Sequence, residues 1–304
     1  MIDLPEGQCV RFPDETQTGP QFSWRSLSDI DARLSDMDRM GIDRQLLSGW
    51  IDLAGYELAP EMAEEYCRAH NQALAEIASA HSDRFVALGT TPLQDPSAAA
   101  RVLRHSVEEL GMAGVQLATR IGNQYIDAHL DLDEFWSAAE ELGAFLLIHP
   151  VRPLPSVDLD RYLLENSVGR PAETSIALAG LIMSGVFERH PSLRVCAVHG
   201  GGFTPFQIGR LDQSFRQLPQ VVGKQISRPP SAYLESIYVD SIVHDSSALR
   251  FLIDRLGADH ILLGTDYPFP MGDSDPIASI DATPGLTSAE RASILGATAN
   301  ELIR

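Results

Sequence analysis

Short apolar runs alternate with longer amphipathic segments from about residue 28 to the end of the chain. The apolar runs are rich in Val, Ile and Leu, which is typical of parallel strands that are covered on both faces. The segments between them, such as Pro171 to Arg189, repeat apolar residues at helical spacing. Ser28 is placed to cap the first of these helices, which Gly41 ends. The predicted strands begin near residues 44, 84, 114, 144, 193, 236 and 259. This alternation predicts an α/β fold built on a parallel sheet.

The seven predicted strands are one fewer than a (β/α)8 barrel needs. An arc of seven strands leaves two apolar edges unpaired, which is an aggregation hazard. We therefore expect the first strand to be missing, very short at Met1 to Leu4, or replaced by Cys9 to Phe12. Residues 1–28 are irregular and punctuated by prolines, which predicts an arm or a hairpin. The whole chain, residues 1–304, is predicted to form a single barrel domain of this kind.

Three of the predicted strands end on a side chain that can bind a metal ion: His149, His199 and Asp266. Because the carboxyl ends of parallel barrel strands meet at one mouth, we expect these side chains to converge there. Two neutral imidazoles and a carboxylate suit a divalent metal such as zinc. Such a metal lowers the pKa of a bound water to about 7, which makes a nucleophile available. The alternative is that each histidine only hydrogen-bonds a neighbouring carbonyl.

Other polar residues are weaker candidates. Asp240 and Ser241 lie near the end of another predicted strand. Arg210, on the helix that follows His199, could pair bidentately with a carboxylate, although a solvated helix arginine is more common. The remaining histidines on predicted helices or at their ends are expected to be solvated; they are His70, His81, His105, His129 and His190.

The chain is acidic, with 23 Lys and Arg residues against 42 Asp and Glu residues and a net charge of -19. This charge argues against binding to nucleic acid or to an anionic membrane, whereas local arginines can still bind a small anionic acid. The three cysteines, Cys9, Cys67 and Cys196, have no CxxC spacing and suggest neither a disulfide framework nor a thiolate zinc site. No run approaches the roughly 20 apolar residues of a membrane span, and the N-terminus does not resemble a signal peptide. We therefore expect a cytoplasmic protein.

Several longer motifs carry a resemblance to a known family. They are Gly-Arg-Pro-Ala-Glu-Thr (169–174), Met-Ser-Gly-Val-Phe-Glu-Arg (183–189), His-Gly-Gly-Gly-Phe (199–203), Gly-Arg-Leu-Asp (209–212) and Leu-Gly-Thr-Asp-Tyr-Pro-Phe-Pro (263–270). Together they resemble the amidohydrolase superfamily (amidohydrolase-related family 2), in the branch that contains aminocarboxymuconate semialdehyde decarboxylase and the related aromatic acid decarboxylases. The resemblance covers the chain from about Ser28 to Ile303.

The resemblance implies a TIM-type barrel with a single divalent metal, usually zinc, with manganese as the other candidate. It makes His149 and Asp266 metal ligands and His199 the catalytic base. It matches Arg210 to an arginine that reaches a substrate carboxylate, in some members across a homodimer interface. The family has a further substrate arginine in its N-terminal region, for which Arg25 is a candidate.

The chain departs from the family at its N-terminus. Members carry His-x-His on the first barrel strand after Ile-Asp, whereas here Ile2–Asp3 is followed by Leu-Pro-Glu and no histidine precedes His70. Either the chain as given starts late or has lost a segment, or the protein binds metal weakly or not at all. In the family the His-x-His ligands lie on the first barrel strand, so the missing ligands and the missing strand are one difference.

The function expected on these grounds is metal-dependent, non-oxidative decarboxylation of a small unsaturated or aromatic carboxylic acid. In one mechanism His199 activates a water that adds to a substrate double bond; in the other Asp266 protonates the ring carbon before CO2 leaves. A metal-dependent hydrolase or hydratase acting on a lactone, amide or enol-type bond is the first alternative. An inactive barrel that serves as a partner subunit is the second, favoured by the absent His-x-His.

Overall fold

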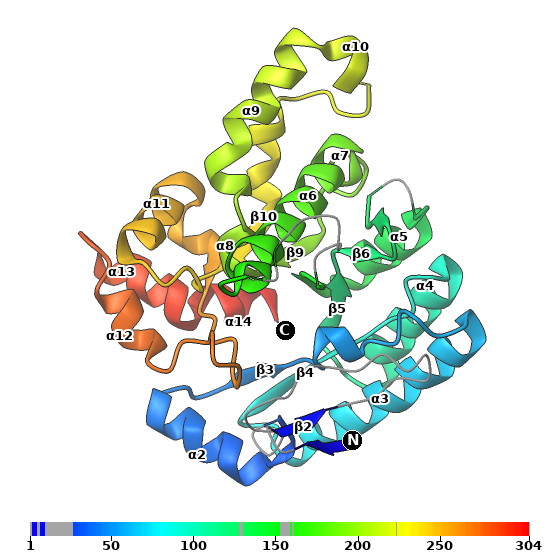
Figure 1. Cartoon of the computed structure of the whole chain (residues 1–304), viewed down its shortest axis with the longest axis vertical. Coiled ribbons are helices and arrows are strands. Elements are labelled where there is room, and N and C mark those ends of the chain that lie inside the picture. Colours follow the sequence, from blue (N-terminus) through cyan, green and yellow to red (C-terminus); the bar gives the residue numbers. More distant parts are fainter. Residues whose placement is uncertain are drawn as a thin grey trace.

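Seven parallel strands form the central sheet of the protein. The computed structural model describes residues 2–4, 7–9, 27–127, 130–152, 159, 161–222 and 224–303. The strands are β3 (Gln45–Leu47), β4 (Phe85–Gly89), β5 (Gly114–Ala118), β8 (Phe145–His149), β9 (Arg194–Ala197), β10 (Ile237–Asp240) and β11 (Ile261–Leu262). They pair in the order β11-β10-β9-β8-β5-β4-β3, so each strand lies beside its neighbour in the sequence. The predicted α/β alternation with seven strands is confirmed, and the sheet curls into an open TIM-type barrel (Figure 1).

Helices surround the outer face of this sheet (Figure 1). The α-helices of the described residues are α2 (Ile30–Met40), α3 (Pro60–Ala80), α4 (Pro96–Arg104), α5 (Asp133–Leu142), α6 (Arg170–Met183), α7 (Val186–Arg189), α8 (Val198–Gly201), α9 (Thr204–Gln217), α10 (Pro219–Val222), α11 (Ser246–Leu256), α12 (Pro276–Asp281), α13 (Ser288–Ala292) and α14 (Thr298–Leu302). The shorter helical turns include η1 (Ile51–Leu53), η2 (His105–Glu109), η3 (Glu165–Gly169), η4 (Pro230–Ser236), η5 (Ala258–His260) and η6 (Ser293–Ala297). Among all of these, none has the length and the apolar character that crossing a membrane requires.

Two helix boundaries differ from the sequence prediction. The cap of α2 is Asp29 instead of Ser28, because the Asp29 side chain accepts a hydrogen bond from the Ala32 backbone N–H at 2.9 Å. The helix predicted over 171–189 divides into α6 and α7 at Gly185, whose φ is 75°. A Cβ at Gly185 would lie 2.4 Å from the Gln225 carbonyl oxygen, so only glycine fits this bend.

Alternate residues of each strand face two different apolar layers. On β8, Leu146 and Ile148 join the large core under the helices, whereas Phe145 and Leu147 join a smaller inner cluster. Successive strand residues point to opposite faces, so His149 lies on the inner side with Leu147. Leu302 of α14 packs into the inner cluster from the other end. The strand register therefore directs the β8 histidine into the barrel.

The N-terminal segment forms a hairpin of its own. β1 (Ile2–Leu4) and β2 (Gly7–Cys9) pair antiparallel in a separate two-stranded sheet. In the part of the chain that the structure describes, neither strand pairs with β3 or β11, which are the two end strands of the large sheet. Residues 2–4 and 7–9 thus pair with each other, so Met1 to Leu4 does not supply the first barrel strand in the described part of the chain, and the arm or hairpin expected over residues 1–28 stays a prediction. Phe12 and Arg25, which the sequence analysis names, lie outside the described residues.

The β11 edge of the sheet is partly covered by the C-terminal helices. The Leu263 backbone N–H donates to the Ile294 carbonyl oxygen at 3.0 Å. This bond attaches the end of β11 to η6, so that the helices following Asp266 hold its strand in place.

Candidate metal and substrate site

His149 ends β8 in a form suited to binding a metal ion. Its Nδ1 lies 2.9 Å from the Pro150 carbonyl oxygen, which can only accept, so Nδ1 carries the proton and the Nε2 lone pair is available. Burial holds the pKa of His149 well below its usual value, and the charges of His199 and Arg170 lower it further. A neutral imidazole oriented by a carbonyl is the usual metal-ligand form of histidine.

His199 follows β9 on a tight turn of left-handed backbone. Its φ is 58°, and the next three residues, Gly200 to Gly202, also have positive φ. A Cβ at Gly200 would lie 2.5 Å from Val243 Cγ1, and one at Gly202 would lie 2.3 Å from the Pro171 carbonyl oxygen. The glycines are therefore required where the turn packs against neighbouring protein. The turn swings the His199 side chain toward β8.

Asp266 follows β11 and is also left-handed, with φ 52°. Burial raises the pKa of its carboxyl group; the charge of His199 lowers that pKa, and nearby Asp240 raises it. A buried carboxylate beside an imidazole is a common arrangement for holding a cation or for moving a proton.

The three strand-end side chains converge as their placement predicts. One ligand atom from each of His149, His199 and Asp266 lies within 4.8 Å of the other two, and among the described residues they are the group able to hold a metal ion. The two imidazole rings meet edge to face, with centroids 5.3 Å apart. Donors that share a tetrahedral ion at about 2.1 Å are roughly 3.4 Å apart, so a small closure of these side chains accommodates one. Two nitrogens and a carboxylate oxygen suit a divalent metal of the zinc or manganese type.

Asp240 and Ser241, the weaker candidates, brace the loops that carry the site. Asp240 Oδ1 accepts hydrogen bonds from the backbone N–H groups of Gly200 at 2.9 Å and Ile242 at 3.1 Å. Ser241 Oγ accepts from the Gly264 N–H at 3.1 Å. The end of β10 thereby connects the turn of His199 to the segment that leads to Asp266.

Arg210 lies apart from this group. It is exposed on α9, which projects away from the barrel (Figure 1). Among the described residues, no hydrogen bond or ion pair joins its side chain to the three converging residues. The role of Arg210 in substrate binding therefore stays a prediction.

An ion pair that the sequence analysis did not single out adjoins the site. Arg170, at the start of α6, donates from Nη1 to the Pro150 carbonyl oxygen at 3.0 Å and from Nη2 to Asp52 Oδ2 at 3.1 Å. Its positive charge lowers the pKa of both His149 and Asp266. The sequence signal for Arg170 was its place in the Gly-Arg-Pro-Ala-Glu-Thr motif, whereas Asp52 carries no motif.

Two histidines expected to be solvated are not. His190 is buried and its Nδ1 lies 3.4 Å from Glu140 Oε2. His70 lines a small cavity with Trp50 and Gln116, and burial lowers the pKa of its imidazole. Both lie on or beside helices whose inner faces are covered, which the spacing of apolar residues alone did not reveal.

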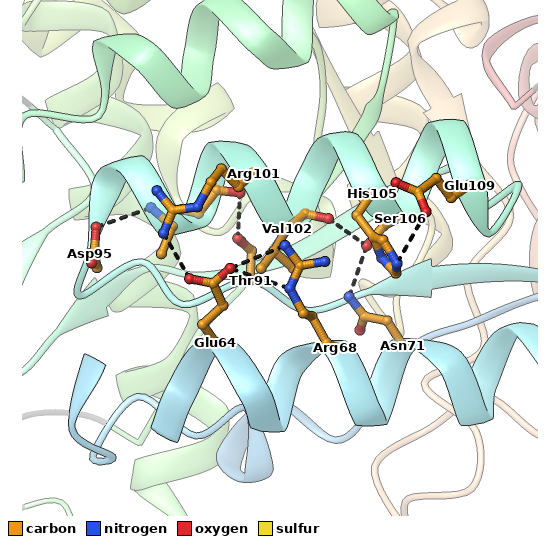
Figure 2. Close-up of polar contacts among 12 residues, drawn as sticks. Glu64, Arg68, Asn71, Thr91, Asp95, Arg101, Val102, His105, Ser106 and Glu109 are labelled. Carbon is orange, nitrogen blue, oxygen red and sulfur yellow. Dashed lines mark hydrogen bonds and ion pairs between the residues drawn. The ribbon is translucent and has the colours of Figure 1, made fainter. Parts of the chain in front are cut away.

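A polar network between α3 and α4 fixes the loop after β4 (Figure 2). Asn71, fully buried on α3, donates to the Thr90 carbonyl oxygen and to Ser106 Oγ, each at 2.9 Å, and accepts from the Thr90 N–H at 2.8 Å. Nearby, Glu64 bridges Arg68 and Arg101. Thr90 lines the same cavity as His70, so this network sets one wall of the barrel mouth.

A curled parallel sheet that brings two imidazoles and a carboxylate together at the carboxyl ends of its strands defines a barrel enzyme of the metal-dependent hydrolase type. Comparison with known families gives the same class. The chain belongs to the amidohydrolase family, whose model matches residues 23–304.

Several proteins similar to the chain are decarboxylases. It is 34% identical over 275 residues to 2-amino-3-carboxymuconate-6-semialdehyde decarboxylase of Dictyostelium discoideum, covering 90% of this chain and 76% of that protein. It resembles the crystal structure of 5-carboxyvanillate decarboxylase from Sphingomonas paucimobilis, with TM-score 0.83, 28% identity, and 92% and 84% of the two chains covered. A second similar structure is dihydroxybenzoic acid decarboxylase from Polaromonas sp. JS666 with bound manganese and the inhibitor 2-nitroresorcinol (TM-score 0.78, 26% identity, 91% and 85% covered).

Proposed function

We propose that this protein is a metal-dependent, non-oxidative decarboxylase of a small aromatic or unsaturated carboxylic acid. The observation that carries the proposal is the convergence of His149, His199 and Asp266 at the strand ends of a barrel whose relatives remove CO2 from such acids. The substrate is an anion, which local positive charge must attract because the chain as a whole is acidic.

The metal proposed is zinc, with manganese as the other candidate since a related decarboxylase structure contains it. His149 Nε2 and a carboxylate oxygen of Asp266 are the proposed ligands, with His199 close enough to complete the set. When bound, a divalent metal supplies positive charge that polarises substrate oxygens and stabilises the negative charge developing as CO2 departs.

Side chains of the protein must then deliver one proton to the substrate carbon. Breaking the bond to the carboxyl group leaves an electron pair on the carbon, and a proton must take its place. His199 and Asp266 are the groups that we propose for this transfer. Burial raises the pKa of the Asp266 carboxyl group, and the charge of His199 lowers it.

We also propose that two copies associate through α9. Phe206 on this helix is 74% exposed and meets Phe251 of α11 with ring centroids 5.9 Å apart, and Phe203 beside it is exposed as well. Adjacent exposed aromatic side chains are uncommon on a monomer surface. Packing this face against a second copy would place Arg210 at the interface, where it could reach a substrate carboxylate in the partner's site. Phe206→Asp should shift the protein from dimer to monomer in analytical ultracentrifugation.

The decisive experiment measures CO2 release. Protein loaded with zinc or manganese is incubated with a panel of aromatic and unsaturated acids, and both CO2 and the remaining product are quantified. We expect CO2 and product in equal amounts from at least one acid, and none from the His149→Ala variant. Ring opening or hydration without CO2 would favour the hydrolase or hydratase alternative. Protein that neither binds metal nor turns over any substrate would instead be an inactive barrel.

A further inference from the structure

We propose that Arg170 is an anion-binding residue of the site, which receives a carboxylate of the substrate, and that Asp52 weakens this binding in the free protein. The proposal rests on the proposed function in one respect, that the ligand is an organic acid. It assigns the recognition of this acid to a residue pair within the same chain, separate from Arg210.

Arg170 is fixed relative to the proposed metal ligand by a shared acceptor. The Pro150 carbonyl oxygen accepts one hydrogen bond from His149 Nδ1, at 2.9 Å, and another from Arg170 Nη1, at 3.0 Å. One backbone oxygen therefore sets the position of both the imidazole and the guanidinium. A substrate held at His149 meets a positive charge at a constant place beside it.

The charge of Arg170 acts on the space between the strand ends. Its guanidinium donates to the Pro150 carbonyl oxygen, which also accepts from the His149 imidazole, so the positive charge lies beside the end of β8 where the three side chains converge. An anion that enters there is attracted by this charge.

The Arg170 guanidinium has more N–H donors than it uses in hydrogen bonds within the described residues. Within the described residues its side chain makes two hydrogen bonds, to Pro150 and Asp52, and a guanidinium carries more N–H donors than these bonds use. The Arg170 and Asp52 side chains are 15% and 21% exposed, so the pair is in partial contact with solvent. The bond between them is single, whereas an arginine that is fully matched to a carboxylate forms two.

Arg120 and Glu173 form a second ion pair in the same region. Arg120 has a purely structural role, so its contacts can be compared with those of Arg170. Arg120 pairs with Glu173 at 2.9 Å, and it also donates to the carbonyl oxygens of Gly122 and Arg152. Its side chain and that of Glu173 are 10% and 6% exposed. Arg120 is thus surrounded by protein acceptors, whereas Arg170 has donors free at the barrel mouth.

Asp52 approaches Arg170 from the opposite side of the mouth. It lies on η1, which follows β3, and is separated from Arg170 by 118 positions in the sequence. Its carboxylate offsets the guanidinium charge while no acid is bound. Removing the Asp52 charge should therefore strengthen acid binding, which a purely structural tie between the two loops would not do.

The test measures binding rather than turnover. Manganese-loaded protein is titrated calorimetrically with 2,6-dihydroxybenzoate and with its neutral counterpart resorcinol, and the ratio of the two dissociation constants gives the preference for the carboxylate. Asp52→Asn should tighten acid binding about 3- to 10-fold. Arg170→Gln should weaken it about 10- to 100-fold, and Arg170→Lys should recover only part of the loss, because the charge returns without the geometry of the guanidinium. Resorcinol binding and manganese content should change little in each variant.

Glu165→Gln is the matched control. Glu165 pairs with Arg152 at 3.1 Å on the more exposed side of the same loop, so its loss should leave the carboxylate preference unchanged. The proposal is overturned if Asp52→Asn weakens acid binding as Arg170→Gln does, since the pair would then only hold the loops together. It is also overturned if wild-type protein binds the acid no better than resorcinol. Because the readout is binding, failure of the decarboxylation assay would be a separate result.

Discussion

Asp240 Oδ1 accepts a hydrogen bond from the backbone N–H of Gly200, the residue after His199, at 2.9 Å. The same oxygen also accepts from the Ile242 N–H, so one carboxylate oxygen satisfies two donors, one on each of two loops. The position of the His199 imidazole therefore depends on a residue of the neighbouring strand.

Asp240→Ala should destabilise the protein and displace His199. Two buried N–H groups lose their acceptor, at a cost of about 1 to 3 kcal/mol each. We expect urea denaturation to show a loss of about 2 to 6 kcal/mol, together with reduced activity. Asp254→Ala is the control, because Asp254 is exposed in its ion pair with Arg250 and should change stability little. Equal effects of the two substitutions would contradict this role for Asp240.

His199→Ala and His149→Ala should fail in different ways. Loss of His149 removes a proposed ligand, so metal content should fall together with activity. Loss of His199 removes a proposed proton carrier, so kcat should fall by roughly 10²- to 10⁴-fold while most of the metal is retained. Metal analysis of both purified variants, beside their kinetics, tests this. Equal loss of metal and rate in His199→Ala would instead make His199 a ligand.

Arg210→Lys should raise the KM for the acid substrate with a smaller change in kcat. An ammonium group keeps the charge but lacks the two-pronged geometry that matches a carboxylate, and we expect an increase of about 10-fold. Steady-state kinetics above and below the dimer dissociation constant checks it. Arg216→Lys, on the same helix and bonded to Gln213, serves as the control. Unchanged kinetics across the acid panel would remove Arg210 from substrate binding.

Asn71→Ala should lower stability without direct loss of chemistry. It would leave the Thr90 N–H and carbonyl oxygen without their side-chain partner. It would also remove the bond to Ser106 Oγ that Figure 2 shows. We expect a loss of about 2 to 4 kcal/mol in urea denaturation. Gln72→Ala, one residue away and exposed, should change stability by less than about 0.5 kcal/mol.

Glu290 gives the C-terminal helices a pH-dependent contribution. Hydrogen bonds from Arg250, and then from Thr287, lower the pKa of Glu290 from 4.5 to about 2. Because the folded pKa lies below the unfolded one, the ionised carboxylate stabilises the fold above about pH 4.5, and this contribution is lost as the pH falls toward 2. Glu290→Gln should therefore lower the Tm at pH 7 and do so by a smaller amount at pH 3.5. A difference that does not depend on pH would show that its charge is not involved.

The strands and the converging side chains could be predicted from the sequence because both depend on local pattern plus one general rule. An apolar run that ends on His149 or Asp266 places that residue at the strand's carboxyl end, and parallel strands bring such ends together. The pair of Arg170 and Asp52 could not be predicted in this way. The two residues are 118 positions apart, and neither departs from the pattern of apolar and polar positions in its own segment.

The N-terminal hairpin illustrates the same limit. The prolines and the short apolar pieces predict a hairpin, but pairing between β1 and β2 rather than with β3 is a choice among distant partners. Local pattern specifies that a strand forms and gives no information about which sheet it joins. Burial of His190 against Glu140 likewise depends on a residue 50 positions away.

The left-handed backbone of His199 and Asp266 means that the most stable version of this protein is not its working version. A residue with a Cβ in that conformation costs about 1 to 2 kcal/mol relative to glycine. A screen that selects only for thermal stability should therefore accept glycine at both positions. The resulting protein should be more stable and have no catalytic activity. Anyone who stabilises this scaffold should hold these two positions constant and look for improvements elsewhere.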